Sequence, residues 1–140
     1  MDYDENVVLT RYIWNHYPHL FTDFELHVRR VIDVRTKVVL YSKQNVDKVA
    51  LDEFLANPND TQNIAEQYQE ARRKFGDTDE PLVNAALKDG VESYRQEVCK
   101  RILREHNDKV FINRCPKCQR IVRTPEAKLC LWCGHSWFND

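Results

Sequence analysis

Apolar residues recur at three- and four-residue steps through the N-terminal three quarters of the chain, a pattern typical of helices packed on one face. The spacing predicts a first helix over residues 5–17, ending at Pro18, because the residue before a proline is pushed out of the α region. Thr22 and Glu25 form a capping box that opens a second helix, expected to run to about Lys43. Its predicted inward positions are Phe24, Val28, Val31, Val38 and Tyr41.

The middle of the chain predicts a turn at residues 57–60 and a polar helix over residues 64–75, stopped by Gly76. One long helix should then run from residue 78 to about residue 106. Its apolar positions continue in register across Gly90, so no break is predicted there despite the ~1 kcal/mol that a mid-helix glycine costs. Those positions are Val83, Leu87, Val91, Tyr94, Val98 and Ile102. We find no internal repeat and no low-complexity tract.

The character of the sequence changes in its last quarter, where residues 110–112 form a short β-type run. Residues 109–140 hold four of the five cysteines and two of the three tryptophans. The predicted fold class is therefore mainly α, with a helical body at residues 1–108 and a small C-terminal β module at residues 109–140. Trp132 and Trp137 are expected to supply most of the module's core.

Four cysteines, Cys115, Cys118, Cys130 and Cys133, form two CxxC pairs separated by eleven residues. A two-residue gap lets a tight turn direct two thiolates at one ion about 2.3 Å away, and two such pairs complete a tetrahedron. Because four thiolates leave no open coordination position, we predict one structural Zn²⁺ in a zinc ribbon. A rubredoxin-like iron site uses the same four-sulfur geometry and is the alternative metal. A redox CxxC of thioredoxin type would need a βαβ context, which the pattern lacks.

Two further residues lie close to this chemistry without a defined role. His135 follows Cys133 by two positions and could replace a cysteine as ligand, but with four thiolates present it is expected beside the site. Cys99 lies on the predicted long helix and is expected to be a small buried hydrophobe.

The C-terminal sequence resembles the zinc ribbon of a group of uncharacterised bacterial proteins. The resemblance is carried by the pattern CPxC…TPxA…CxxCGxxW, which begins at Cys115 and ends at Trp137, and by the preceding residues 111–114. It implies a zinc ribbon fused to a helical body. It transfers no catalytic residue, because that group has no assigned activity.

Overall charge and hydropathy argue against a membrane span and against attraction of nucleic acid by a global basic field. With 21 Lys and Arg against 22 Asp and Glu, the net charge is −1, so no global basic field attracts nucleic acid or anionic lipid. Uncharged stretches are too short to span a membrane, which needs about 20 apolar residues. The first six residues are acidic and lack the features of a secretory signal. Cysteines paired for metal in such a chain lead us to expect a cytoplasmic protein.

Charge is nevertheless uneven along the chain. Residues 109–140 carry six basic and two acidic side chains, a net charge of +4, whereas residues 1–108 have a net charge of −5. A basic ribbon with Trp132, Trp137 and Phe138 could stack on bases and pair with phosphates. A Zn(Cys)₄ centre, however, carries −2 and offsets part of that charge. We therefore expect the ribbon to dock on the long helix. Its basic residues should then face the thiolates or acidic side chains; they are Lys117, Arg120, Arg123 and Lys128.

No HExxH, GxSxG or phosphate-binding glycine loop occurs in the sequence. We predict a non-enzymatic binding or adaptor protein whose partner is another protein. A nucleic-acid-binding zinc ribbon is the second hypothesis, and an enzyme with an unrecognised site in the helical body is the third.

Overall fold

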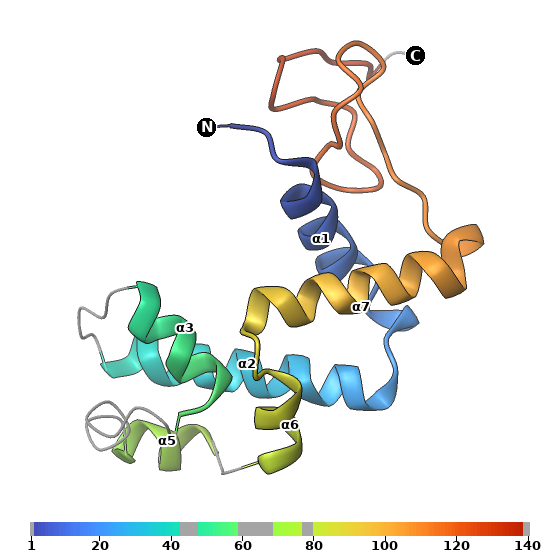
Figure 1. Ribbon diagram of the computed structural model, residues 1–140. Helices are drawn as coiled ribbons and strands as arrows, with labels where there is room; N and C mark the ends of the chain where they lie inside the picture. Colours follow the sequence, from blue (N-terminus) through green and yellow to red (C-terminus); the bar gives the residue numbers. More distant parts are fainter. Residues whose placement is uncertain (1, 43–47, 59–68, 77–79, 139–140) are drawn as a thin grey trace. The chain divides into compact units, whose positions relative to one another are not determined.

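The computed structural model describes residues 2–42, 48–58, 69–76 and 80–138, which contain six α-helices and no β-strand (Figure 1). The predicted mainly α class is confirmed. The chain divides into two compact units, one of Met1–Phe21 with Arg95–Asp140 and one of Thr22–Tyr94. The predicted boundary between residues 108 and 109 stays a prediction, because compactness alone does not show which part folds independently.

The first helix of the first unit, α1 (Glu5–His16), forms where the sequence predicts it. Its N-terminus is capped by Asp4, whose carboxylate accepts a hydrogen bond from the Val7 N–H at 3.2 Å. Tyr17 ends the helix before a 3₁₀ turn, η1 (Pro18–Leu20). Its buried side chains are Thr10, Tyr12, Ile13 and Trp14.

A second helix, α7 (Val91–His106), contributes most of its length to this unit and is followed by a 3₁₀ turn, η2 (Asn107–Lys109). The Arg101 guanidinium donates to the Leu20 carbonyl at 3.0 Å, and the Arg95 guanidinium lies 5.5 Å from the centre of the Trp14 ring. Arg101 thus binds the last residue of η1, and Arg95 packs on a buried ring of α1. Through these two side chains, α7 contacts both η1 and α1.

The second unit contains α2 (Asp23–Ser42), α3 (Lys48–Ala56), α5 (Gln69–Phe75) and α6 (Pro81–Ala86). The predicted capping box is confirmed at the start of α2. Glu25 N–H donates to the Thr22 hydroxyl at 3.1 Å, and Thr22 N–H donates to the Glu25 carboxylate at 2.8 Å. Val38, Phe54 and Ala71 form a buried cluster that joins α2 to α3 and α5.

A buried arginine connects three helices of this unit. The Arg35 side chain on α2 is fully buried and donates to the Leu55 and Ala56 carbonyls at 3.1 and 3.2 Å. It also donates to the Asn84 side-chain oxygen at 2.8 Å, on α6. The guanidinium therefore satisfies carbonyls at the end of α3 that the helix itself leaves unpaired.

The predicted long helix over residues 78–106 is wrong, because the chain breaks between α6 and α7. Helix α6 ends at Ala86, and Gly90, which has a left-handed φ of +100°, immediately precedes α7. Val83, Leu87 and Val91 are all buried on either side of the break. The apolar residues keep helical spacing across the break, so their periodicity alone could not reveal it.

Other expectations differ in detail. Phe24, which was predicted to face inward, lies in the first turn of α2 and is 44% exposed. Helix α3 was not predicted, and α5 is the described part of the helix expected over residues 64–75. The Tyr41 side chain, residues 59–60 of the predicted turn, residues 64–68 and the start of the predicted long helix lie outside the described residues.

The predicted β module is not confirmed within the described residues. Residues 110–138, here called the cysteine segment, contain isolated bridges between Arg114 and Ile121 and between Leu129 and Ser136, and no strand. Across the described part of the chain, no helix is long and apolar enough to cross a membrane.

Candidate metal centre

The first pair of cysteines is held in a tight hydrogen-bonded hairpin. The Gln119 N–H donates to the Cys115 carbonyl at 2.9 Å, and the Cys115 N–H donates to the Arg120 carbonyl at 2.9 Å. Gln119 has φ +66°, an uncommon conformation for a residue with a side chain. This left-handed residue turns the chain immediately after Cys118.

The second pair repeats this arrangement fifteen residues later. The Gly134 N–H donates to the Cys130 carbonyl at 2.8 Å, and the Cys130 N–H donates to the His135 carbonyl at 2.8 Å. Gly134 has φ +80° at the position equivalent to Gln119. The two hairpins are thus equivalent in backbone geometry, although no repeat beyond the CxxC spacing itself is visible in the sequence.

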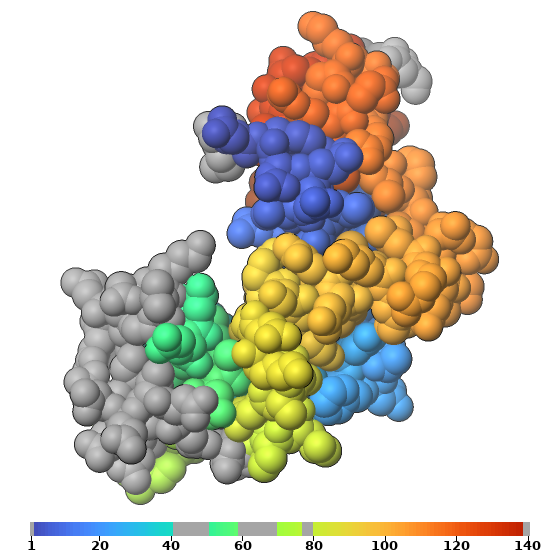
Figure 2. Space-filling model, viewed as in Figure 1, coloured from blue at the N-terminus to red at the C-terminus, as the bar shows by residue number. Residues whose placement is uncertain are grey.

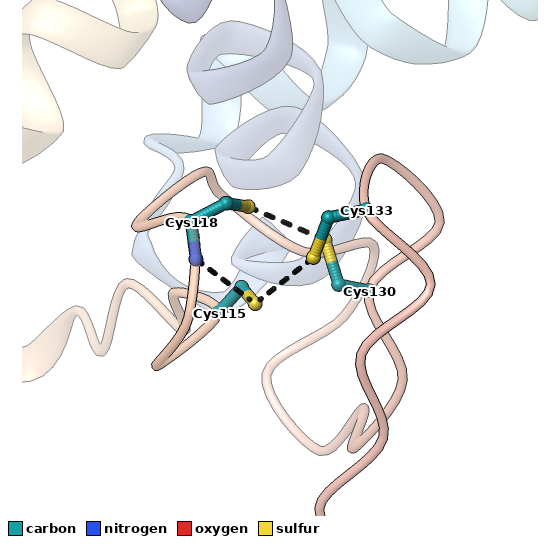
Figure 3. A group of neighbouring side chains, drawn as sticks. All are labelled: Cys115, Cys118, Cys130 and Cys133. Atoms are coloured by element: carbon teal, nitrogen blue, oxygen red, sulfur yellow. Dashed lines mark hydrogen bonds between the residues drawn. The ribbon is translucent and has the colours of Figure 1, made fainter.

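The four sulfur atoms converge on one point from the two hairpins (Figure 3). The Cys115 and Cys133 sulfurs are 3.7 Å apart, as are the Cys118 and Cys130 sulfurs, and all four lie within 4.8 Å of one another. A tetrahedron with metal–sulfur bonds of about 2.3 Å has edges of about 3.8 Å. The four cysteines are therefore placed to hold one metal ion, as predicted.

Backbone amides favour the thiolate form of the first cysteine. Its sulfur accepts from the N–H groups of Lys117 at 3.4 Å and Cys118 at 3.5 Å. Burial opposes ionisation, but these amides, together with the thiols of Cys133 and Cys118, outweigh it and lower the pKa of Cys115 to about 7. A deprotonated sulfur is the form that binds metal.

Crowding acts in the opposite direction on the last cysteine. The His135 amide lowers the pKa of Cys133, but desolvation and the neighbouring thiols of Cys115, Cys118 and Cys130 raise it overall to about 11. Four thiols so close together do not all ionise near neutral pH by themselves. A cation between them would remove this repulsion, so the cluster has the electrostatic character of a metal site.

His135 and Cys99 both lie outside the sulfur cluster. The His135 ring stacks on Trp137, with ring centres 5.8 Å apart, and its contribution to the site is the backbone amide near Cys133. Cys99 is buried on α7 beside Thr10, and burial raises the pKa of its thiol. The expectations that His135 lies beside the site and that Cys99 is buried agree with these positions.

The core of the cysteine segment is larger than the two tryptophans predicted for it. Val122 is buried with Cys115 and Cys130, and Trp132 and Trp137 pack against this cluster while remaining partly exposed. Val122 and Trp137 occupy equivalent positions of the two hairpins. Each hairpin therefore contributes two sulfurs and, at this equivalent position, an apolar side chain to a shared centre.

Two tyrosines attach the start of the cysteine segment to α1. The Tyr12 hydroxyl donates to the Phe111 carbonyl and accepts from the Asn113 N–H at 3.1 Å. The Tyr17 hydroxyl donates to the same carbonyl at 3.0 Å and accepts from the Phe111 N–H at 2.9 Å. We call this arrangement the tyrosine clamp; every backbone polar group that it pairs belongs to Phe111 or Asn113.

Asn113 carries the connection onward to the linker between the two hairpins. Its buried side-chain amide donates to the Thr124 carbonyl at 3.0 Å and the Ala127 carbonyl at 2.8 Å. Asn113 therefore binds the linker between the two CxxC pairs through its side chain, while its backbone N–H binds Tyr12 of α1. The clamp and Asn113 were missed by sequence reasoning, because contacts across about a hundred residues leave no local pattern.

The N-terminal residues add a second attachment at the first hairpin. The Ile121 N–H donates to the Tyr3 hydroxyl at 3.0 Å, and the Arg114 guanidinium forms an ion pair with Glu5 at 2.5 Å. Glu5 is exposed, so this pair contributes little stability by itself. These hydrogen bonds and this ion pair attach the cysteine segment to α1 and its flanking residues. The docking of the segment on the long helix stays a prediction.

The predicted compensation by basic residues also differs from what is seen. Lys117, Arg120, Arg123 and Lys128 are all exposed, and none forms an ion pair with another described residue. Arg120 lies over the Tyr3 ring, 5.5 Å from its centre. The ion pair between the segment and an acidic residue of the N-terminal region is made by Arg114.

No protein-family model matches the chain, and neither a curated protein nor a solved structure shows significant similarity to it. The clustering of the four cysteines is confirmed by the structure. The resemblance to the bacterial zinc-ribbon group stays a prediction.

The equivalence of the two hairpins predicts opposite effects of two substitutions. Gly134→Ala should cost roughly 1 kcal/mol, because an added Cβ meets open space and the penalty is that of the left-handed backbone alone. Gln119→Gly should relieve the same penalty and stabilise the fold by about 0.5–1 kcal/mol. Chelator competition for the bound metal would report these changes as shifts of about two- to fivefold in affinity.

A third variant separates the backbone effect from a side-chain contact. The Gln119 side-chain amide donates to the Pro116 carbonyl at 3.2 Å, and Gln119→Ala removes that contact while keeping the left-handed strain. Gln119→Ala should therefore not reproduce the gain of Gln119→Gly. Equal gains from both would attribute the effect to the side chain and contradict the proposed strain.

Proposed function

We propose that Cys115, Cys118, Cys130 and Cys133 hold one structural Zn²⁺ and that the cysteine segment is a two-hairpin zinc ribbon. Sulfur separations of 3.7 Å, close to the edge of a zinc–thiolate tetrahedron, support this assignment. Four thiolates complete the coordination of zinc and leave no position for water or substrate, which favours a structural ion. Iron fits four sulfurs equally well and is the alternative to exclude. A cytoplasmic location, where thiols stay reduced, fits a set of metal-binding cysteines.

The purified protein is expected to contain one zinc ion per chain. Elemental analysis measures the metal, and X-ray absorption at the zinc edge should give four sulfur neighbours near about 2.3 Å. Iron as the main metal, or a Cys115–Cys118 disulfide in the protein purified without oxidant, would contradict the assignment.

We further propose that the protein is a non-enzymatic adaptor that binds another protein through the cysteine segment. The observation that carries this proposal is the concentration of exposed apolar side chains there. Of the seven large hydrophobic residues that are exposed among the described residues, four belong to this short segment. They are Phe111, Leu129, Leu131 and Phe138. Clustered exposed apolar groups are typical of protein-binding surfaces.

Two matched leucine substitutions test this surface. Leu131 is 65% exposed in the cysteine segment and Leu82 is 76% exposed on α6, so each can be replaced by serine without opening a core. Affinity capture from the native cell extract, with mass spectrometry and nuclease treatment, should recover a protein with the unmodified chain and with Leu82→Ser. Leu131→Ser should lose it, and the purified pair should bind directly in calorimetry.

Nucleic-acid binding is the second candidate, favoured by the exposure of Lys117, Arg120, Arg123 and Lys128. After the −2 charge of a zinc–thiolate centre is counted, the segment keeps an excess of about +2, which is small for phosphate binding. We expect no affinity tighter than about 10⁻⁴–10⁻⁶ M at physiological salt, the range of non-specific binding. A salt-sensitive, submicromolar complex in an anisotropy titration would reverse the ranking.

A further inference from the structure

A groove runs between α1 and the cysteine segment, inside the first compact unit. Figure 2 shows these two parts of the chain lying against each other. One wall is the face of α1 that carries Val8, Arg11, Tyr12 and Asn15. These residues stand at positions i, i+3, i+4 and i+7, so one stripe of the helix lines the groove along two turns. The stripe places apolar groups at Val8 and Tyr12 and polar groups at Arg11 and Asn15.

The opposite wall comes from both hairpins of the metal centre. Ile121 and Val122 are buried at its base, Arg123 is exposed beside them, and Leu131 and Trp132 complete it. Leu131 and Trp132 are the two residues between Cys130 and Cys133, so their position depends on the closed cysteine cluster. A bound metal would therefore fix the shape of this wall.

Two contacts hold the walls together. The His16 ring nitrogen lies 3.2 Å from the Arg123 carbonyl oxygen, which fixes the backbone of Arg123 against α1. The Tyr3 ring meets Trp132 edge to face, with ring centres 5.0 Å apart. The groove has a volume of about 640 Å³, in the range of about 300–1,000 Å³ typical of ligand sites.

The charged side chains around the groove favour a negatively charged ligand. Arg11 and Arg123 are both exposed, one on each wall, and neither forms an ion pair with any described residue. Among the described residues, no acidic side chain lines the groove. Two unpaired guanidinium groups above an apolar floor complement carboxylates on either side of an apolar side chain.

We propose that this groove binds an acidic peptide segment of a partner protein, with one aliphatic side chain seated on Val8, Val122 and Leu131. Carboxylates of the same segment pair with Arg11 and Arg123. The inference rests on the proposed adaptor function and identifies the chemistry of its partner. Peptides recognised in this way gain orientation from arginine–carboxylate pairs and affinity from the buried anchor.

The walls favour a peptide over a nucleic acid. Stacking of bases requires exposed aromatic faces, but the Tyr12 ring is buried and Trp132 already packs against Tyr3. Most of the remaining apolar lining is aliphatic, which suits an aliphatic side chain. Three of the exposed basic residues, Lys117, Arg120 and Lys128, do not line the groove.

A defined probe tests the proposal on the full zinc-loaded chain. A short synthetic peptide with one central leucine between glutamates is titrated to about 1 mM while methyl resonances are followed by NMR. Saturable shifts are expected at Val8, Val122 and Leu131. A peptide with lysines in place of the glutamates, and one with serine in place of the leucine, should each bind at least about tenfold more weakly.

Matched charge reversals locate the binding on the protein. The double variant Arg11→Glu with Arg123→Glu should weaken the acidic peptide at least about tenfold. Lys117→Glu with Lys128→Glu removes the same charge from exposed positions outside the groove and should change binding by less than about threefold. If the groove variant fails to fold, Arg11→Gln with Arg123→Gln provides the same comparison with a smaller expected loss.

Each outcome decides between the two proposals. The proposal that the groove binds an acidic peptide is wrong if no methyl shifts appear up to about 1 mM peptide. It is also wrong if both double charge reversals weaken peptide binding equally. An oligonucleotide that shifts the same methyl groups more tightly than the peptide overturns the choice of a peptide. A captured partner protein that binds the Arg11→Glu, Arg123→Glu variant normally leaves the adaptor function standing and removes the groove from it. Peptide binding in the groove, with no partner protein captured from the extract, would leave the groove proposal standing and contradict the adaptor function.

Discussion

Replacing Cys130 with serine is expected to abolish stoichiometric zinc binding and to unfold the cysteine segment together with α1. Zinc in four-thiolate peptides contributes on the order of 10 kcal/mol of apparent binding energy, and so small a segment has little other core. Cys130 belongs to the buried cluster with Cys115 and Val122, so the substitution removes a ligand and a packed side chain at once. Elemental analysis and hydrogen exchange of backbone amides measure both effects.

The loss should reach α1 because the clamp residues Tyr12 and Tyr17 lose Phe111 and Asn113 as partners. The amides of α2 should stay protected, since that helix belongs to the second compact unit. Cys99→Ala is the matched control, because Cys99 is buried outside the sulfur cluster and its variant should retain one zinc. Persistent protection of α1 in Cys130→Ser would favour the predicted boundary at residue 108, with the segment as a semi-independent appendage.

What the sequence predicted well rests on local chemistry. The CxxC spacing places two sulfurs per turn wherever it occurs, and the four cysteines are clustered as that spacing requires. The capping box at Thr22 and Glu25 likewise needs only residues three positions apart. Both signals lie within one turn of chain, so the surrounding fold had little influence on them.

What the sequence did not predict depends on backbone conformation or on distant partners. Gly90 lies in a break between two helices that the apolar spacing does not reveal, because Val83, Leu87 and Val91 are buried on both sides of it. The left-handed conformation at position 119 could not be predicted, because the residue there is glutamine and not glycine. Tyr12 is buried on α1, and its hydroxyl contacts Phe111 and Asn113 about a hundred residues later. Periodicity identifies a buried position but not the group that it will contact.

Replacing Tyr12 with phenylalanine is expected to weaken zinc binding by about tenfold to a hundredfold. The substitution keeps the ring but leaves the Asn113 N–H, which is buried, without the Tyr12 hydroxyl as acceptor. An unsatisfied buried donor costs about 1–3 kcal/mol. Because zinc binding and folding of the segment are linked, that cost appears as lost metal affinity in chelator competition.

Tyr17→Phe is the matched control for the clamp. Its hydroxyl pairs with both backbone groups of Phe111, a residue that is 61% exposed, so water can replace the lost bonds. The loss of affinity should therefore be smaller than for Tyr12→Phe. The two substitutions should also be non-additive, because both hydroxyls donate to the same Phe111 carbonyl. Equal and additive losses would show that the tyrosines act independently.

The clamp also predicts how stability changes at alkaline pH. Burial raises the pKa of Tyr12 from its usual 10.0 to about 12, against the lowering effect of the Asn113 amide. The folded protein therefore holds the phenolic proton more tightly than the unfolded chain does. Its stabilising contribution is complete below about pH 10 and is lost as the pH rises toward about 12. The difference in unfolding free energy between wild type and Tyr12→Phe should shrink across this interval. A difference that stays constant through pH 12 would show that the buried hydroxyl is not the group that couples α1 to the metal centre.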